Sequence, residues 1–237
     1  NTGGGISILS SQLLSNSDFV TSAFAAEYGN ALSGVFDLKL RRGNNEKHEY
    51  TLQAGLLGLD ASMEGPFSKK YKGSYLVDYR YSTLELLNKL GVLRADGSVT
   101  RFQDLSYNVY LPTKRSGTFS FFGFGGLSSD RQPAKADSAK WEAEDDRFDD
   151  RFHSNTALAA LTHTILLRQN TTLKSAIAYS YNANGDKVKY VEDNYDFSDV
   201  YEDDYRTKKW NISTVVNHRF SNRAILRSGA MVNFISL

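Results

Sequence analysis

Apolar and polar residues alternate along much of this chain, as they do in a β-strand with one buried and one solvated face. The clearest stretch is 71–81, whose odd positions are mostly aromatic and whose even positions are mostly polar. The same alternation occurs at 103–111, 172–182, 209–220 and 224–235. Two more stretches, 118–127 and 152–167, are strand-like without a clear assignment of faces. The pattern therefore predicts an all-β protein.

The alternation changes parity between residues 49 and 64. Apolar residues fall at even positions up to Leu56 and at odd positions from Leu57, with Gly55 and Gly58 beside the switch. A β-bulge shifts a strand by one residue and a tight hairpin reverses its direction, and both produce such a change. The stretch is thus either one bulged strand or two strands joined by a hairpin.

The connections between these strands fall into two alternating classes. Short connections lie at 65–70, 112–117, 168–171 and 221–223, and long ones at 83–101, 129–149 and 186–206. This alternation predicts an antiparallel up-and-down meander and is typical of outer-membrane β-barrels. In the first long loop we expect a short helix over 84–90, capped by Thr83 and ended by Gly91.

Charge also separates between the two classes of connection. The long loops hold the acidic runs 142–150 and 192–204. The short turns and their edges hold the basic residues Lys69, Lys70, Lys114, Arg115, Arg168, Arg219 and Arg223. Acidic runs of this kind are either hydrated surface or a place for divalent cations. Neither run has the spacing of an EF-hand calcium loop.

Composition narrows the class of protein. The chain has 237 residues, of which 41% are hydrophobic, and a net charge of +1. No run of about eighteen apolar residues occurs, which excludes a membrane-spanning helix, whereas a membrane β-strand needs only about ten alternating residues. The charge balance gives no indication of nucleic-acid binding. The absence of cysteine excludes disulfides and thiolate metal sites.

No motif for catalysis or cofactor binding is present. The sequence has no nucleophile elbow, phosphate-binding loop or metal-binding helix motif. The four histidines, His48, His153, His163 and His218, are spaced unlike metal ligands. Ser154 or Thr162 near His163 are hydrolase candidates that lack an orienting partner and an oxyanion hole. We therefore expect no enzyme, no catalytic residue, no cofactor and no metal site.

The segment 24–41, FAAEYGNALSGVFDLKLR, reads as a turn that leads into a strand. Its first half is small and polar, and residues 35–40 alternate between apolar and polar. Together with the stretches 3–9 and 16–19, it closely resembles the end of the plug domain of TonB-dependent outer-membrane receptors. The resemblance is strong over residues 1–42 and weaker over the strands that follow.

The resemblance implies that residues 1–42 are the C-terminal part of a plug domain. Residues 43–237 would then be the first eight or nine strands of a large transmembrane β-barrel. A hairpin at 49–64 is favoured, because a chain leaving a periplasmic plug must rise and descend before a short turn at 65–66. That reading gives nine strands.

The implied function is active transport of a scarce nutrient across the outer membrane of a Gram-negative bacterium, energised through TonB. The expected partners are outer-membrane lipid, an unknown nutrient and the TonB energy-coupling protein, with no nucleic acid. TonB would contact a part of the plug that is expected to precede Asn1. The alternatives are a non-transporting surface β-barrel, an adhesin or glycan-binding β-protein, and a soluble β-sandwich.

The alternation also predicts how plug and barrel meet. Tyr75, Val77 and Tyr79 would face lipid, and Ser74, Asp78 and Arg80 would face the lumen. We expect the plug to dock through the cations Lys39, Arg41 and Arg42 against the carboxylates Asp60, Glu64 or Asp78. In a water-filled lumen each such pair is worth only about 0 to 1 kcal/mol, so the contact can break in each transport cycle. The alternative is that all six side chains are separately hydrated.

Overall fold

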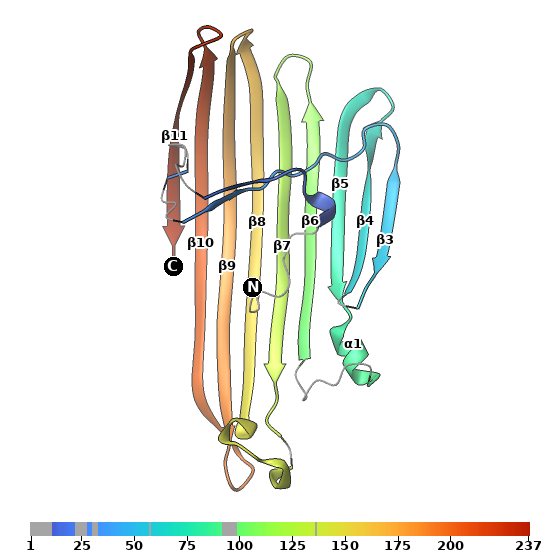
Figure 1. The fold of residues 1–237 in the computed structure, drawn as a ribbon, viewed down its shortest axis with the longest axis vertical. Helices are drawn as coiled ribbons and strands as arrows, with labels where there is room; N and C mark the ends of the chain where they lie inside the picture. The colour runs from blue at the N-terminus through green and yellow to red at the C-terminus, as the bar shows by residue number, and fades with distance from the viewer. Residues whose placement is uncertain (1–10, 22–27, 30–32, 57, 92–98, 136) are drawn as a thin grey trace.

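A computed structural model of the chain describes residues 11–21, 28–29, 33–56, 58–91, 99–135 and 137–237. Within these residues the protein is a single long antiparallel sheet with a short N-terminal segment lying across it (Figure 1). In the segment 24–41 that carries the plug resemblance, residues 24–27 and 30–32 lie outside the described residues, as do all of 3–9. No helix among the described residues is long and apolar enough to cross a membrane.

The sheet has nine strands, and each pairs with its neighbours in chain order. The strands are β3 (Glu49–Ala54), β4 (Gly58–Ser68), β5 (Tyr71–Ser82), β6 (Val99–Pro112), β7 (Thr118–Gln132), β8 (Phe148–Arg168), β9 (Thr171–Val191), β10 (Phe197–Arg219) and β11 (Ile225–Ser236). The all-β fold and the up-and-down meander predicted from the alternation are confirmed.

The parity break at 49–64 is a hairpin and not a bulge. β3 pairs with β4 in a regular register that sets Tyr50 opposite Met63. The turn is closed by the Gly55 N–H, which donates to the Gly58 carbonyl at 2.9 Å. The two apolar series therefore belong to two adjacent strands that share one face.

The predicted long loop at 186–206 is wrong. β9 runs on to Val191 and β10 starts at Phe197, so only residues 192–196 connect them. Several of the acidic residues that suggested a loop lie in β10, and two of them have basic partners on β9: Lys187 pairs with Glu202 and Lys189 with Asp199. Such opposite-charge pairs stabilise a sheet, so a charged stretch can remain extended.

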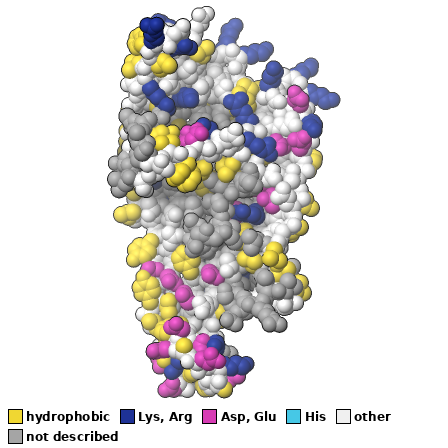
Figure 2. All heavy atoms as spheres, viewed as in Figure 1, with side chains coloured by type: hydrophobic (Ala, Val, Ile, Leu, Met, Phe, Trp, Pro, Cys, Tyr) yellow, Lys and Arg dark blue, Asp and Glu magenta, His cyan; other side chains and the backbone are white. Residues whose placement is uncertain are grey.

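The other two long connections carry short helices. The predicted helix after β5 is confirmed as α1 (Leu84–Lys89), and Gly91 with φ +71° follows it. Thr83, the residue expected to cap this helix, donates its hydroxyl to the Leu56 carbonyl in the turn between β3 and β4. The loop between β7 and β8 holds the 3-10 helices η2 (Ser138–Lys140) and η3 (Glu144–Arg147). Figure 2 shows basic side chains gathered toward the short turns and acidic side chains toward the opposite end.

Over β4 to β8 the polar face of the sheet is more buried than the apolar face, whereas β11 is exposed on both faces. The polar face includes Ser62, Ser74, Asp78, Asp104, Ser106, Asn108 and Ser154, whose exposed fractions are only 1–8%. The apolar face includes Tyr50, Leu52, Met63, Tyr79, Leu105, Phe121, Leu161, Ile177, Trp210, Ile212 and Val232, whose exposed fractions are 40–79%. The predicted grouping of Tyr75, Val77 and Tyr79 against Ser74, Asp78 and Arg80 is confirmed by the strand register.

The N-terminal segment, residues 11–48, crosses the polar face (Figure 1). It contains the 3-10 helix η1 (Ser11–Leu13) and a two-stranded ribbon of β1 (Asp18–Val20) and β2 (Val35–Asp37). The strand expected over 35–40 thus ends early, although Leu40 still bridges to Leu14. η1 lies against β5 and β6, and Leu13 and Leu76 are fully buried.

Candidate functional site

The candidate site is the contact between the N-terminal segment and the polar face, and its centre is a paired arginine and glutamate. Arg41 Nη1 and Nη2 donate to the two carboxylate oxygens of Glu64 on β4, at 2.8 and 2.7 Å. Arg41 Nε also donates to the Gln12 carbonyl at 2.5 Å. The two paired side chains are 32% and 12% exposed, so the pair is largely withdrawn from water. A bidentate pair of this kind fixes orientation as well as distance.

Uncharged groups extend this contact to three further residues. The backbone N–H of Asn44 donates to Glu64 Oε2 at 2.6 Å. On β6, Asn108 Nδ2 donates to the Arg41 carbonyl at 2.8 Å, and Asn108 Oδ1 accepts from Ser120 Oγ on β7 at 2.9 Å. Residues 41–44 are therefore anchored to β4 and β6, and Asn108 is held in turn by Ser120 of β7.

A glycine permits this close approach of two backbones. A Cβ at Gly43 would lie 2.0 Å from the Tyr75 carbonyl oxygen of β5. Real Cβ atoms do not approach backbone so closely, so any larger residue would push the segment away from the sheet. Gly43 thus sets how close Arg41 and Asn44 come to Glu64.

The structure places the six predicted docking residues in different surroundings. Arg41 and Glu64 are brought together. Arg42 lies over the Tyr110 ring, with its guanidinium carbon 3.9 Å from the ring centroid. Asp78 is 2% exposed on the polar face, and Asp60 lies opposite Arg80 in the register of β4 and β5.

The expectation that Lys39 contacts a carboxylate of the sheet is wrong. Lys39 Nζ pairs with Asp18 at 2.6 Å, within the N-terminal segment itself. The antiparallel ribbon of β1 and β2 causes this, because it brings Asp18 beside the end of β2. Sequence reasoning missed the contributions of Gln12, Asn44 and Asn108, since backbone groups and amides carry no charge pattern that could mark them.

The side chains considered for chemistry have other partners. Ser154 Oγ donates to Asn184 Oδ1 at 2.7 Å, and His163 Nε2 contacts the Ser116 carbonyl oxygen at 2.6 Å. Ser154 and His163 are nine residues apart on the extended strand β8, about 30 Å at the usual rise per residue. In the described part of the chain, no group of three or more His, Asp or Glu side chains could hold a metal ion.

Comparisons of this chain with protein-family models, curated proteins and solved structures found no match. Its function must therefore be inferred from its own residues and their geometry.

Proposed function

We propose that this chain is part of an outer-membrane active-transport receptor for a scarce nutrient, energised through TonB. The observation that carries this proposal is that the sheet exposes its apolar face and covers much of its polar face. Apolar side chains that are 40–79% exposed extend over all nine strands, and over β4 to β8 the polar face is the more buried one. Exposed apolar surface costs about 25 cal/mol per Å² in water, so an apolar face of this extent needs a cover, and in this proposal the cover is lipid.

The strand lengths agree with a membrane location. A transmembrane strand needs about 9 to 11 residues, and β4 to β7 have 11 to 15. β8, β9 and β10 have 21, 21 and 23 residues, so about half of each would project beyond the bilayer on the side of the long loops. On the apolar face, Tyr79, Tyr81 and Tyr181 lie where the apolar residues give way to charged ones, as aromatic residues do at a membrane interface.

In this proposal the N-terminal segment is the end of a plug, and the polar face is the inner wall of a barrel. Nine strands are too few to enclose a plug, because about eight strands already give a barrel filled by its own side chains. Within the described residues, β3 and β11 each pair with one neighbour only. Further strands would have to continue the sheet from these edges.

Transport would then use the contact at Arg41. Nutrient binds at the loop end, and force relayed through TonB displaces the plug, which requires the pair of Arg41 and Glu64 to separate. Before displacement, the two hydrogen bonds between Arg41 and Glu64 hold the plug in one orientation against the wall. The same pair can re-form after each transport cycle. Arg41 and Glu64 act as a reversible latch.

A non-transporting surface β-barrel, or an adhesin or glycan-binding β-protein, is the alternative. It would use the same lipid-facing strands, but it has no need for a polar segment bound across the inner wall. The contact of residues 41–44 with β4 and β6 therefore favours the receptor.

The test uses the full-length protein, expressed in a Gram-negative host with and without a functional TonB. We expect electrophoretic mobility in detergent to change on heating, as it does for folded barrels, and growth on the limiting nutrient to require both proteins. Unchanged mobility would exclude a barrel. A folded barrel whose removal leaves nutrient uptake unaffected, across a panel of iron complexes and glycans, would favour the adhesin.

A further inference from the structure

Three hollows lie in a line on the apolar face, at its border with the charged ends of the strands. The hollow farthest toward the loops has a volume of about 450 Å³ and shares Arg101, Ser129 and His153 with the next one. The middle hollow, of about 570 Å³, shares Gln103, Leu127 and Asn155 with the third, of about 430 Å³. Shared walls make the three hollows one continuous groove.

The end of the groove nearest the middle of the sheet is apolar. Tyr79, Leu105, Leu127 and Tyr181 line it. Gly125 and Ala157, which face each other on β7 and β8, leave the space between these larger side chains. This end of the groove fits a hydrocarbon chain, since it offers aromatic and aliphatic walls within the lipid-facing surface.

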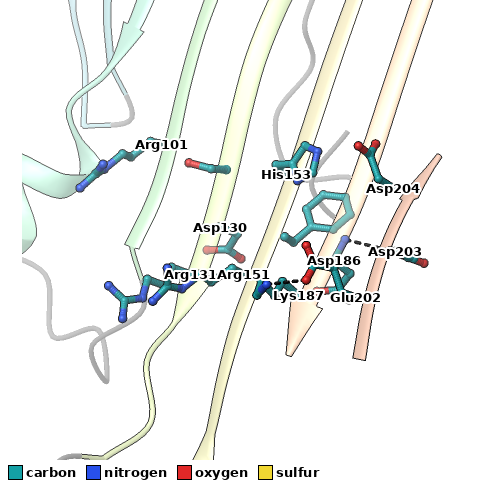
Figure 3. Close-up of a pocket in the computed structure, with 12 residues that line it drawn as sticks. Arg101, Asp130, Arg131, Arg151, His153, Asp186, Lys187, Glu202, Asp203 and Asp204 are labelled. Atoms are coloured by element: carbon teal, nitrogen blue, oxygen red, sulfur yellow. Dashed lines mark hydrogen bonds and ion pairs between the residues drawn. The ribbon is translucent and has the colours of Figure 1, made fainter. Parts of the chain in front are cut away.

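The opposite end of the groove is cationic on the β7 and β8 side (Figure 3). The strand register sets Arg131 opposite Arg151 and Arg151 opposite Lys187, so three cations stand in one row. Like charges placed directly opposite one another destabilise a sheet unless an anion lies between them. Lys187 is neutralised by Glu202, which leaves the arginine pair as the centre of positive charge.

One buried carboxylate holds the two arginines in place. Asp149 accepts from Arg131 Nη2 at 2.6 Å and from Arg151 Nε at 2.7 Å. The arginine side chains are 49% and 51% exposed, whereas Asp149 is 2% exposed. Two guanidinium groups against one carboxylate leave a surplus positive charge, with donors still accessible from the surface.

The remaining acidic residues at this end do not cancel that charge. Asp130 alternates with Arg131 on β7 and accepts from Thr100 Oγ1 at 3.0 Å, so it belongs to the other face. Asp186 and Asp203, which are set opposite each other, alternate with Lys187 and Glu202 and belong to the other face too. Asp204 on the near face pairs with Arg206. The positive end of the groove therefore remains at Arg131 and Arg151.

We propose that this groove binds a membrane lipid with a phosphorylated headgroup. Arg131 and Arg151 contact the phosphate, and an acyl chain lies between Tyr79, Leu105 and Tyr181. Guanidinium groups bind phosphate through paired hydrogen bonds, and the groove continues from them directly into apolar surface, which a free anion would not use. This inference rests on the proposed membrane location and goes beyond transport, because it assigns a specific lipid site to the outer surface.

The test uses the full-length protein in dodecyl maltoside micelles, titrated with a diphosphorylated glycolipid and counted for bound lipid by native mass spectrometry. We expect the double variant Arg131→Gln/Arg151→Gln to bind this lipid at least about tenfold more weakly, because both phosphate donors are lost. The matched control is Lys114→Gln/Arg115→Gln, which removes the same charge from the short turn between β6 and β7. Equal binding by wild type and the Arg131/Arg151 variant would overturn the proposal.

Two further measurements distinguish a bound lipid from a bound free anion. Gly125→Leu fills the apolar hollow, and its new Cβ fits because the nearest atom would be 3.5 Å away. We expect it to weaken lipid binding while leaving the arginines unchanged. Inorganic phosphate at millimolar concentration should not displace the lipid. Displacement by phosphate, or full binding by Gly125→Leu, would show a simple anion site and contradict the lipid assignment.

A separate measurement distinguishes this proposal from the proposed function. Insertion of the same protein into phosphatidylcholine vesicles is followed by flotation and by the change in mobility on heating. Failure to insert would overturn both proposals. Insertion with no effect of the Arg131 and Arg151 changes would overturn the lipid site alone.

Discussion

Arg41 and Glu64 are joined by two hydrogen bonds, of 2.8 and 2.7 Å, although 23 residues separate them in the chain. We expect Arg41→Ala to loosen the N-terminal segment from the sheet, because Glu64 would keep only the Asn44 N–H among these donors. The swap Arg41→Glu/Glu64→Arg should recover part of the loss. A double-mutant cycle in the full-length protein, measured by protease cleavage within residues 11–48, should give a coupling of about 1 kcal/mol or more.

The same cycle should be repeated with nutrient uptake as its readout, at equal surface expression. Lys39→Ala is the control, since Lys39 pairs with Asp18 inside the segment. Independent effects of the Arg41 and Glu64 changes in both measurements would exclude the latch.

Gly43→Ala should displace the N-terminal segment without changing any charge. The new methyl group would lie 2.0 Å from the Tyr75 carbonyl oxygen, so the backbones must move apart. Forced overpacking of this kind typically costs about 1 to 3 kcal/mol. Hydrogen exchange of residues 41–44 should become faster. Gly29→Ala is the control, because no atom of the described residues lies within 4 Å of the place its methyl group would take, and equal exchange in the two variants would contradict the close approach.

Ile212 and Ser213 test which face of the sheet meets lipid. They are neighbours on β10, and the strand register places Ile212 with Trp210 on the apolar face and Ser213 on the polar face. We expect Ile212→Arg to cost about 2 to 4 kcal/mol if it lies near the bilayer midplane, and Ser213→Arg to be mild. The free energy of unfolding in urea and lipid vesicles gives the comparison.

Labelling provides an independent check, because the chain has no native cysteine. A cysteine at 212 should react with a lipid-phase reagent and one at 213 should not. The opposite result, or equal unfolding penalties for the two arginine variants, would reverse or remove the assigned faces.

The loop-side ends of β8 and β9 should be more stable at pH 5 than at pH 7. Burial, and then a hydrogen bond and the charge of Asp186, raise the pKa of Asp150 to about 6. These carboxylates lie beyond the proposed membrane-spanning part of the strands. An ionised Asp150 can only accept hydrogen bonds, so a proton on Asp150 relieves its repulsion with Asp186.

The direction of this pH dependence follows from the number of protons that the folded and unfolded chains bind. An unfolded aspartate has a pKa of about 4, whereas Asp150 in the folded chain has a pKa of about 6. Between these two pH values the folded chain holds a proton that the unfolded chain has lost. Stability is therefore lost as the pH rises through this window. Hydrogen exchange of residues 148–152, corrected for intrinsic rates, should slow at pH 5, and Asp150→Asn should abolish the difference. Asp145→Asn, in η3 of the adjacent loop, is the control, and a persistent pH effect in Asp150→Asn would contradict this assignment.

Arg147→Ala should release the loop between β7 and β8 from the turn at 192–196. Arg147 Nε donates to the Val191 carbonyl and Nη2 to Asp193, each at 2.8 Å. Its guanidinium also lies over the rings of Trp141 and Tyr190. We expect faster proteolysis of residues 133–147, only partly restored by Arg147→Lys, because an ammonium lacks the planar fork. Lys140→Ala, an exposed cation in the same loop, should leave the cleavage rate unchanged.

The sequence alone determined that the chain is all-β and which residues share a face in the clearly alternating stretches, such as 71–81, but it left the faces of 118–127 and 152–167 open. Side-chain direction in an extended chain alternates with a period of two, which is a local property, so residues such as Tyr75, Val77 and Tyr79 could be grouped without any partner. The change of parity at Gly55 and Gly58 was visible for the same reason, but it fitted a bulge as well as a hairpin, and the pairing of β3 with β4 decided for the hairpin.

Only the tertiary structure decided which remote groups meet. The choice of Glu64 for Arg41, and of Asp18 for Lys39, depends on how the N-terminal ribbon lies across the sheet. The acidic stretch that suggested a loop before Arg206 became strand because β9 offers Lys187 and Lys189 at matching positions. Such choices depend on register and packing between distant segments, and the local periodicity of a sequence does not contain that information.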